Sequence, residues 1–313
     1  MIDITRIKTY SIADRPSKVC IDRMGVTHEA GSSFAEFLRH LPGFLGAENL
    51  LEAAARIARA HSNGKTVILG MGAHSIKVGL SPVIIDLIRR GVIKGVAMNG
   101  ACVIHDFELA LAGATSEDVD SAILDGSFGM ARETGGAINR AVSGGVSAGL
   151  GLGAAVGEMI LREKLPNAEL SILAACRGAG IPATVHVAVG TDIIHMHPEA
   201  DGAAIGEGSL RDFRTLTGLV AVLKDGVYIN LGSAVILPEV FLKAVTLARN
   251  LGHDVSSLTT VNMDFIQHYR PGVNVLKRPT LGSGRAFALT GHHEIMLPLL
   301  AAAVIEALAG GIK

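Results

Sequence analysis

Short runs of β-branched and other apolar residues alternate along this chain with longer segments whose apolar positions recur at helical spacing. Strands are predicted over 66–71, 92–98, 183–189, 226–231 and 257–263, and helices over 33–41, 47–61, 81–90, 169–177, 208–223 and 238–251, with a further helix that ends at Leu111. Ser81 is expected to cap the helix 81–90, with Pro82 in its first turn. Strands that alternate with helices of this length predict βαβ units.

The fold class expected from this pattern is α/β, with a doubly wound, mainly parallel Rossmann-like sheet and helices on both faces. The predicted nucleotide-binding domain spans 65–313, and 1–64 are predicted to form an N-terminal arm and helices. The apolar run 141–157 is too rich in glycine for a membrane span, and we interpret it as a loop leading into a tightly packed helix.

The composition narrows the classes of partner. Aromatic residues make up 4% of the chain, tryptophan is absent and the net charge is −1, so nucleic-acid binding is not expected. The three cysteines are too widely spaced for a disulfide framework or a zinc site, which fits a reducing, cytoplasmic compartment. No signal peptide or membrane span is visible. A small-molecule substrate and a homo-oligomer are the expected partners.

Glycine lies next to polar residues at the ends of several predicted strands, where open α/β sheets hold anionic ligands. None of these turns completes the dinucleotide fingerprint or the phosphate-loop pattern, and each could be a plain tight turn. Their succession favours a nucleotide-sized ligand. The predicted cofactor-binding residues are Gly72, His74, Ser75, Asn99, Gly100, Thr191, Asp192, Gly232 and Ser233.

A second arrangement of polar residues leaves a metal-dependent hydrolase open as an alternative. A divalent metal would be held by His105, Asp106, Asp192, His195 and His197, although such spacing often occurs without a metal. His292 and Glu294 precede an apolar helix, where they could cap the helix or contact a substrate. The loop that carries Lys277 is either a solvated basic loop or the source of a nucleophilic lysine.

Several of these segments resemble the deoxyhypusine synthase family, whose members use NAD and spermidine to modify a lysine of a translation initiation factor. The resemblance covers roughly 65–305 and is carried by 70–96, 99–113, 137–140, 169–192, 226–244 and 285–300. It implies the family's fold, NAD as cofactor and a homotetramer with shared active sites. Asp106 matches the last acid of an acidic segment in the family, and His105 replaces a glutamate.

The departures from the family pattern change the expected activity. Leu237-Pro238-Glu239 stands where the family has a catalytic histidine pair, and the family's Trp-Gly-Lys motif is missing, with Lys277 near its place. We therefore expect a divergent deoxyhypusine-synthase-like enzyme, not a true deoxyhypusine synthase, that oxidises an amine or transfers a group through an imine. Lys277 and His105 are the predicted catalytic residues, and Asp106, His292 and Glu294 the predicted substrate contacts. A non-catalytic oligomer on the same fold is a further alternative.

Overall fold

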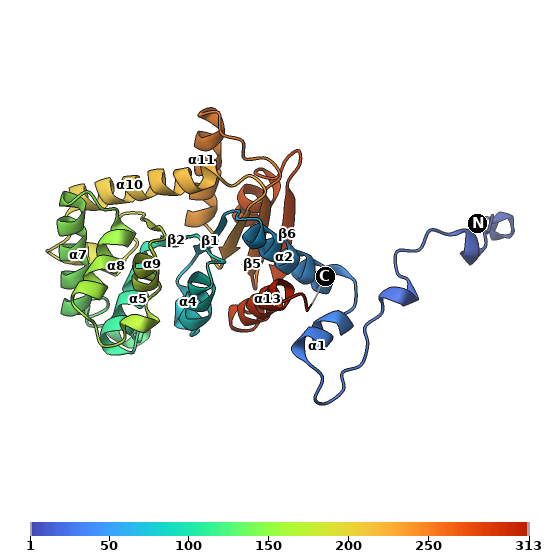
Figure 1. The fold of residues 1–313 in the computed structure, drawn as a ribbon, viewed down its shortest axis with the longest axis horizontal. Coiled ribbons are helices and arrows are strands. Elements are labelled where there is room, and N and C mark those ends of the chain that lie inside the picture. Colours follow the sequence, from blue (N-terminus) through green and yellow to red (C-terminus); the bar gives the residue numbers. More distant parts are fainter. Residues whose placement is uncertain (1, 312–313) are drawn as a thin grey trace.

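A six-stranded parallel sheet forms the centre of the computed structural model, which describes residues 2–311 (Figure 1). Its strands are β1 (Val67–Met71), β2 (Gly95–Asn99), β3 (Ala183–His186), β4 (Val227–Leu231), β5 (Thr259–Asp264) and β6 (Arg285–Thr290). They lie in the order β3-β2-β1-β4-β5-β6, and every neighbouring pair is parallel. This is the strand order of dinucleotide-binding folds, in which the direction of winding reverses between β1 and β4.

The central strands bury both of their faces. In β1, Val67, Leu69 and Met71 join one hydrophobic cluster, while Ile68 points to the opposite face and joins a second cluster. In β4, Tyr228 belongs to that second cluster and stacks on Phe241, with 3.6 Å between the ring centroids. Alternating side chains that are apolar on both faces are typical of a parallel strand covered by helices on each side.

Helices cover both faces, as the doubly wound prediction requires (Figure 1). One face carries α10 (Gly202–Ala221) and α11 (Ile236–Asn250), and the other carries α2 (Leu45–Ser62), α4 (Ser81–Arg89) and α13 (His293–Leu308). Beside the β3 edge lie α5 (Gly100–Ala112), α7 (Arg132–Ser147), α8 (Leu152–Arg162) and α9 (Ile172–Ala179). The shorter helices are α1 (Phe34–His40), α3 (His74–Lys77), α6 (Val119–Ala122) and α12 (Tyr269–Pro271), which a π-helix (Gly272–Lys277) follows. The predicted fold class is confirmed.

Two local predictions differ from the structure. Ser81 is the first residue of α4 rather than its cap, and its buried hydroxyl has no hydrogen-bond partner within the described residues 2–311. The run 141–157 is not a loop leading into a helix, because it contains the last turns of α7, a short turn and the first half of α8. Gly145 lets these two helices approach, since a Cβ there would lie 2.3 Å from that of Ala155.

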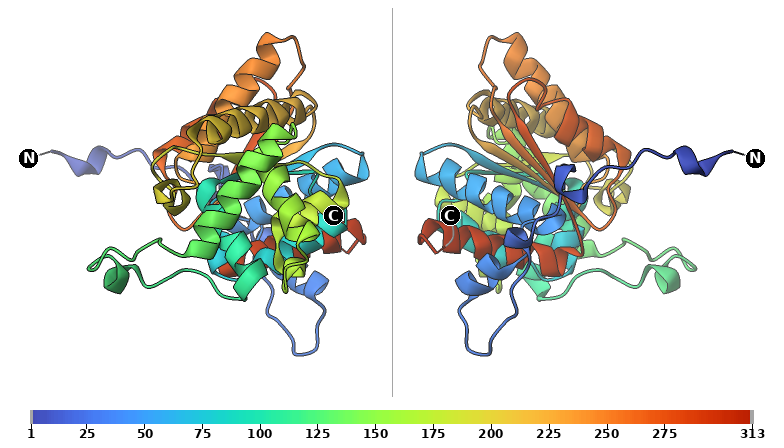
Figure 2. Two further views of the ribbon diagram at one scale, coloured as in Figure 1. Left: turned by 90° about the vertical axis from the view of Figure 1, so that its left-hand side faces the viewer. Right: turned by 90° about the vertical axis from the view of Figure 1, so that its right-hand side faces the viewer.

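The N-terminal region projects from the rest of the chain (Figures 1 and 2). Residues 2–31 contain three 3₁₀ turns, Ile4–Arg6, Ile12–Asp14 and Ile21–Arg23, whereas α2 packs against α13 and contributes buried side chains to the core. The predicted domain division at residue 64 stays a prediction. Within 2–311, no single helix has the length and apolarity to cross a membrane, although α7 and α8, bent by 113°, meet both criteria as a pair.

Candidate active site

Two glycine turns touch at the point where the strand order reverses. Gly72 follows β1 and Gly232 follows β4, and the Gly72 N–H donates a hydrogen bond to the Leu231 carbonyl at 2.9 Å. A Cβ on Gly72 would lie 2.4 Å from the Gly232 carbonyl oxygen, closer than real side chains approach. Glycine is therefore required here by the close approach of two backbones. These turns lie at the carboxyl edge of the sheet, where open α/β folds bind ligands in a crevice, and they would form its floor.

A buried histidine lies directly on this floor. His293 is the first residue of α13, and a Cβ on Gly232 would lie 2.5 Å from its imidazole. His293 is 1% exposed, and neither imidazole nitrogen has a hydrogen-bond partner among residues 2–311. Its Nε2 lies 3.7 Å from Asp264 Oδ1, and the ring of His74 is 5.4 Å away between centroids. Because buried polar atoms are nearly always paired, this imidazole has unused capacity to bind a ligand.

Aromatic rings border the same histidine. Phe265 is the residue after β5, and its ring centroid lies 6.2 Å from that of His293. The same ring stacks on the His292 ring, with 6.0 Å between centroids and 7° between the Phe265 and His292 ring planes. We call His74, Asp264, Phe265, His292 and His293 the switch-point cluster. Its members come from three different strand ends, at β1, β5 and β6.

Burial decides the protonation state of the central imidazole. Burial lowers the pKa of His293 below its usual value, while the nearby Asp264 carboxylate and the Met263 carbonyl act in the opposite direction. The neutral form is therefore favoured near pH 7, and neutral imidazole can accept a proton. Among the predicted site residues only His74 and His292 belong to this cluster. His293 is not among the predicted site residues, and Asp264 lies one residue beyond the predicted strand 257–263.

A cavity of about 230 Å³ lies beside the crevice, and we call it the carboxylate cavity. Its charged and titratable lining residues are Lys77, His105, Glu108, Glu117 and Asp192, and its apolar wall includes Ile104, Val119, Phe128 and Ile193. The four-residue helix α3 links the two sites, because His74 at its start belongs to the switch-point cluster and Lys77 at its end lines the cavity. The structure thus brings the predicted site residues His105 and Asp192 to one cavity.

Hydroxyl groups hold one side of the cavity. The Thr115 hydroxyl donates to Glu108 Oε2 and lies 2.6 Å from His105 Nδ1, while the Thr134 hydroxyl donates to Glu108 Oε1 at 2.9 Å. Since the single hydroxyl proton of Thr115 goes to Glu108, His105 Nδ1 must be the donor in its contact. His105 Nε2 is then the free acceptor. Burial lowers the pKa of His105 and favours this neutral form, although the Glu108 carboxylate acts in the opposite direction and outweighs the smaller lowering effect of Lys77.

Asp192 holds an unsatisfied acceptor at the base of the cavity. Its Oδ2 is buried and has no hydrogen-bond partner within 2–311, and burial raises the pKa of the carboxyl group. A Cβ on Gly100 would lie 2.0 Å from this oxygen, so the glycine makes room for it. An unpartnered carboxylate oxygen at a cavity wall favours a ligand that donates hydrogen bonds.

Four other predicted cofactor-binding side chains make local contacts instead. Asn99 Oδ1 accepts from the Cys102 N–H and caps α5, and Ser75 Oγ donates to the Gly72 carbonyl at 3.0 Å. Ser233 Oγ accepts from the Leu237 N–H, and the Thr191 hydroxyl donates to the Ala188 carbonyl at 2.7 Å. Ser75 and Ser233 are buried under the crevice floor, so they stabilise the turns that form it.

Asp106, a predicted substrate contact, does not line the cavity. Asp106 is fully buried and accepts hydrogen bonds from the Ser171 hydroxyl and from the Ile172 and Leu173 N–H groups at the start of α9. Despite these donors, burial raises its pKa to about 6. The side chain therefore joins α5 to α9 and does not face the cavity.

The alternative metal site also lacks its ligands, because the five predicted side chains face different partners. His197 Nε2 contacts the Gly129 carbonyl at 2.8 Å, and His195 Nδ1 accepts from the Gly190 and Asp192 N–H groups. Within 2–311, no three His, Cys, Asp or Glu side chains gather closely enough to hold a metal ion. The structure therefore does not support this donor set as a metal centre.

The predicted basic loop does not reach the cavity. Lys277 is exposed at the end of the π-helix, and Arg270 forms an ion pair with Glu239 at 3.4 Å. Arg285 begins β6 at the opposite, amino-terminal edge of the sheet. The lysine that does line the cavity is Lys77, which the sequence analysis did not select. Glu294 is exposed beside His292, with 3.9 Å between His292 Nδ1 and Glu294 Oε1.

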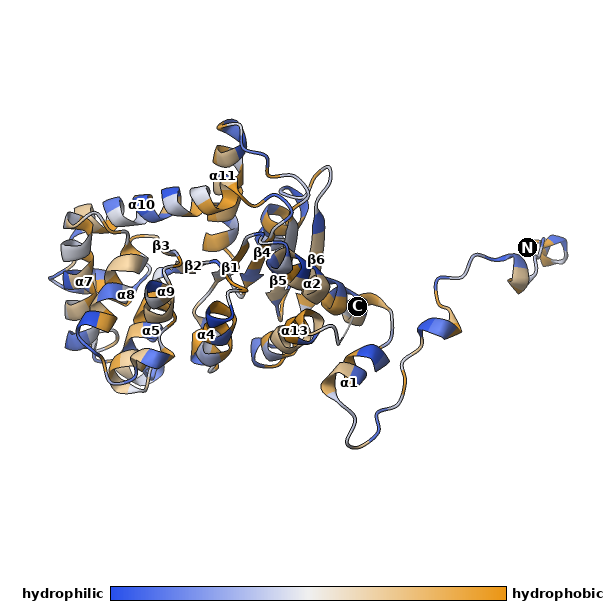
Figure 3. Ribbon diagram, viewed as in Figure 1, coloured by the Kyte–Doolittle hydropathy of each residue, from blue (hydrophilic) through white to orange (hydrophobic). Residues whose placement is uncertain are grey.

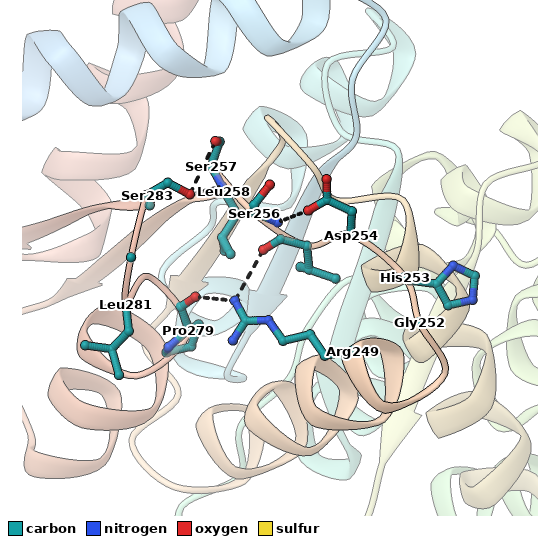
Figure 4. Close-up of a pocket in the computed structure, with 13 residues that line it drawn as sticks. Arg249, Gly252, His253, Asp254, Ser256, Ser257, Leu258, Pro279, Leu281 and Ser283 are labelled. Atoms are coloured by element: carbon teal, nitrogen blue, oxygen red, sulfur yellow. Dashed lines mark hydrogen bonds between the residues drawn. The ribbon is translucent and has the colours of Figure 1, made fainter.

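A further pocket of about 310 Å³ lies at that amino-terminal edge (Figure 4). Arg249 spans its base and donates to the Val255 and Pro279 carbonyls at 3.3 and 2.8 Å. These contacts satisfy the arginine within the fold, and ligands of open α/β sheets bind at the opposite, carboxyl edge. We therefore place the candidate active site at the switch-point cluster and the carboxylate cavity.

Comparison with known proteins agrees with the observed architecture. No protein-family model and no curated protein matches the chain, but solved structures share its fold. The ternary complex of AgrE with ornithine and NAD⁺ superposes with a TM-score of 0.57 at 11% identity, covering 84% of this chain and 34% of AgrE. A protein from Methanococcus maripaludis S2 assigned as LOR/SDH gives 0.54 at 17% identity, covering 93% and 75% of the two chains.

A protein from Entamoeba histolytica assigned as a deoxyhypusine synthase gives a TM-score of 0.52 at 12% identity, covering 89% of this chain and 95% of that one. The chain spans about a third of the length of AgrE and of ArgZ, an arginine dihydrolase of cyanobacteria. At these identities the likeness is one of fold. The resemblance read from the sequence is thus confirmed at that level: the chain has the fold of the deoxyhypusine-synthase-like proteins.

Proposed function

We propose that this chain is an NAD-dependent enzyme that oxidises an amine of a small molecule to an imine. The observation that carries the proposal is the His293 imidazole, buried without a partner on the contact between the Gly72 and Gly232 turns. Open α/β sheets bind dinucleotides at this switch point. AgrE, which shares the fold, forms a ternary complex with ornithine and NAD⁺, and this supports both the cofactor and an amine substrate.

The residues at the crevice fit a dinucleotide in two respects. Gly72 and Gly232 have no side chains, so their backbone can approach a ligand closely, as the glycines of dinucleotide sites do. Phe265 and His292 present flat, partly exposed rings on which a heterocycle could stack. A bound NAD would supply the acceptor for a hydride.

The protein side chains account for the remaining proton and charge. An ammonium group must first lose one proton, because the freed nitrogen lone pair forms the C=N bond as the hydride leaves the neighbouring carbon. Neutral His293 is placed to take this proton, and the Asp264 carboxylate, 3.7 Å away, stabilises the resulting imidazolium. The carboxylates of the adjoining cavity would hold a substrate ammonium group. No nucleophilic lysine is needed for this oxidation, so Lys277 has no role in it.

Calorimetric titration of NAD⁺ tests the cofactor assignment. Wild-type protein is expected to bind about one equivalent per chain, and His293→Ala to bind at least about tenfold more weakly, since the ring forms the crevice wall. His253→Ala, at the opposite edge of the sheet, is the matched control and is expected to bind like wild type. Absence of saturable binding to the wild type would contradict the proposal.

The base assignment needs a separate readout. Once an amine that reduces NAD⁺ is found, His293→Gln is expected to lower turnover by about 10²–10⁴ and to remove the acidic limb of the pH profile. An unchanged pH profile would show that His293 is not the base.

The homotetramer implied by the resemblance also remains a proposal. It is supported by the projecting arm, whose exposed apolar side chains include Ile4, Ile12 and Ile21. Surfaces of this kind are typical of contacts with another chain. A monomeric mass by light scattering would contradict it.

A further inference from the structure

Cationic side chains line another cavity of about 310 Å³ at the amino-terminal edge of the sheet. It adjoins the pocket of Figure 4 and shares Ser257 and Ser283 with it. We call it the amino-edge cavity, and its charged lining residues are Arg56, Arg59, Lys65, Asp225 and Arg285. We infer that this cavity binds the phosphate group of a phosphorylated small molecule. The inference is independent of the proposed function.

Two of these cations already have acidic partners. Arg56 Nε lies 2.6 Å from Glu52 Oε1, and the Arg56 guanidinium is 5.9 Å from the ring centroid of Phe287. Lys65 Nζ lies 3.5 Å from Asp225 Oδ2. The fold therefore holds Arg56 and Lys65, and neighbouring carboxylates compensate their charge.

The other two cations are uncompensated. Arg59, in the last turn of α2, and Arg285, at the start of β6, form no ion pair within 2–311. The Arg59 carbonyl accepts from the Asn63 N–H at 3.0 Å, so the backbone caps this carbonyl and leaves the guanidinium free. The whole chain has a net charge of −1, so the excess of positive charge at this wall is local. Because like charges on one wall repel each other, a bound anion would be stabilised here.

A hydroxyl proton on the same wall is also free. The Ser257 N–H donates to Ser283 Oγ at 3.0 Å, and the Ser257 hydroxyl donates to the same atom at 3.5 Å (Figure 4). The Ser283 hydroxyl proton then has no acceptor within 2–311, so it can donate to a ligand in the cavity. The wall thus offers two guanidinium groups and one hydroxyl, from α2 and from the turn into β6.

This set of donors favours a phosphomonoester. Near pH 7 such a group carries about two negative charges on three oxygens, which matches the two uncompensated arginines. Guanidinium groups bind phosphate through pairs of charge-assisted hydrogen bonds. A carboxylate has one charge and two oxygens, so it offers fewer acceptors to the same three donor groups. A volume of about 310 Å³ lies at the lower end of the range for ligand sites, which favours a small molecule.

The amino-edge cavity is separate from the candidate active site. Lys65 lies just before β1, Asp225 lies just before β4 and Thr259 begins β5, so these strands run from the cavity towards the carboxyl edge. A strand of five residues, such as β1, spans about 17 Å. A ligand in this cavity would therefore not occupy the place proposed for NAD.

Calorimetric titration of ribose 5-phosphate into the full chain tests the inference. Wild type is expected to bind about one equivalent with a Kd of about 0.1 mM or tighter, and ribose is expected not to bind. Arg59→Gln and Arg285→Gln should each weaken binding of ribose 5-phosphate at least about tenfold, because each removes a charge-assisted contact. Arg89→Gln is the matched control, since Arg89 is an exposed arginine at the end of α4 outside the cavity, and it should bind like wild type.

One variant is expected to tighten binding, which damage to the fold could not imitate. Asp225→Asn removes the one acid among the described lining residues, and asparagine tolerates the left-handed backbone at this position, where φ is 59°. Ribose 5-phosphate should then bind about two- to fivefold more tightly.

Absence of saturable binding to wild type would overturn the inference, as would wild-type affinity in both Arg59→Gln and Arg285→Gln. Equal binding of malonate, a dianion that carries carboxylates, would overturn the assignment to phosphate. His293→Ala should leave binding of ribose 5-phosphate unchanged, and its loss there would place the phosphate at the other edge of the sheet and overturn the inference. Thermal midpoints of the variants establish that each is folded.

Discussion

The contact between the two glycine turns predicts a large effect from the smallest possible side chain. In Gly72→Ala, the added Cβ would lie 2.4 Å from the Gly232 carbonyl oxygen, whereas ordinary contacts begin at 3.4 Å. The turns would have to separate by about 1 Å, which is overpacking that costs about 1–3 kcal/mol. The same movement stretches the 2.9 Å hydrogen bond from Gly72 to Leu231, at about 1 kcal/mol more. The expected destabilisation is thus about 2–4 kcal/mol.

Urea unfolding followed by circular dichroism measures this destabilisation. Gly218→Ala is the control, because it is expected to stabilise the protein. Gly218 lies inside α10 with no heavy atom within 4 Å of an added Cβ, so alanine there should stabilise the protein by about 0.5–1 kcal/mol. Gly72→Ala should also weaken NAD⁺ binding, because the crevice floor is displaced. If Gly72→Ala unfolded at the same urea concentration as wild type, the two turns could not be in contact as described.

Two buried polar side chains give further predictions. Tyr228→Phe should raise the free energy of unfolding, measured in urea, by about 1 kcal/mol. The Tyr228 hydroxyl is buried without a partner among residues 2–311, and the ring stack on Phe241 is retained in the variant. A loss of stability would indicate that the hydroxyl has a partner. Burial raises the pKa of Asp212 to about 7, above the unfolded-state value of about 3.9. The folded state therefore favours the protonated carboxyl group. The stability that this preference contributes is complete below about pH 4 and is lost as the pH rises through about 7. Asp212→Asn should therefore reduce the loss of stability between pH 5 and pH 8, and an unchanged pH dependence would contradict the assignment.

The sequence pattern predicted the fold class and five of the six strands, because each of these elements is defined by its own residues. A glycine directly follows the apolar run 66–71 and another follows 226–231, so both turns could be placed at the carboxyl edge of a parallel sheet. That they touch could not be predicted, because the contact depends on β4 pairing with β1 rather than with β3, the strand that precedes it in the chain.

The candidate site was only partly predictable for the same reason. His293 reaches the crevice from the start of α13, and Asp264 from the end of β5, so only the order of strands brings them together. Asp106 lies one position from His105 on α5, yet the helix turns it toward α9 while His105 lines the cavity. Lys277 lies in the connection between β5 and β6, which runs from the carboxyl edge of the sheet to its amino-terminal edge.

The pairing of β1 with β4 has a consequence for how the chain reaches its folded state. Val67 aligns with Val227, so the strands that form the crevice are joined by a very long intervening segment. During synthesis, β1 and β2 emerge well before β4, and one edge of β1 stays unpaired until then. Closing so large a loop is entropically costly, and contacts of this kind form slowly. The cofactor crevice is therefore expected to be among the last features to form, and its precursor with an open edge to be the species most prone to aggregate.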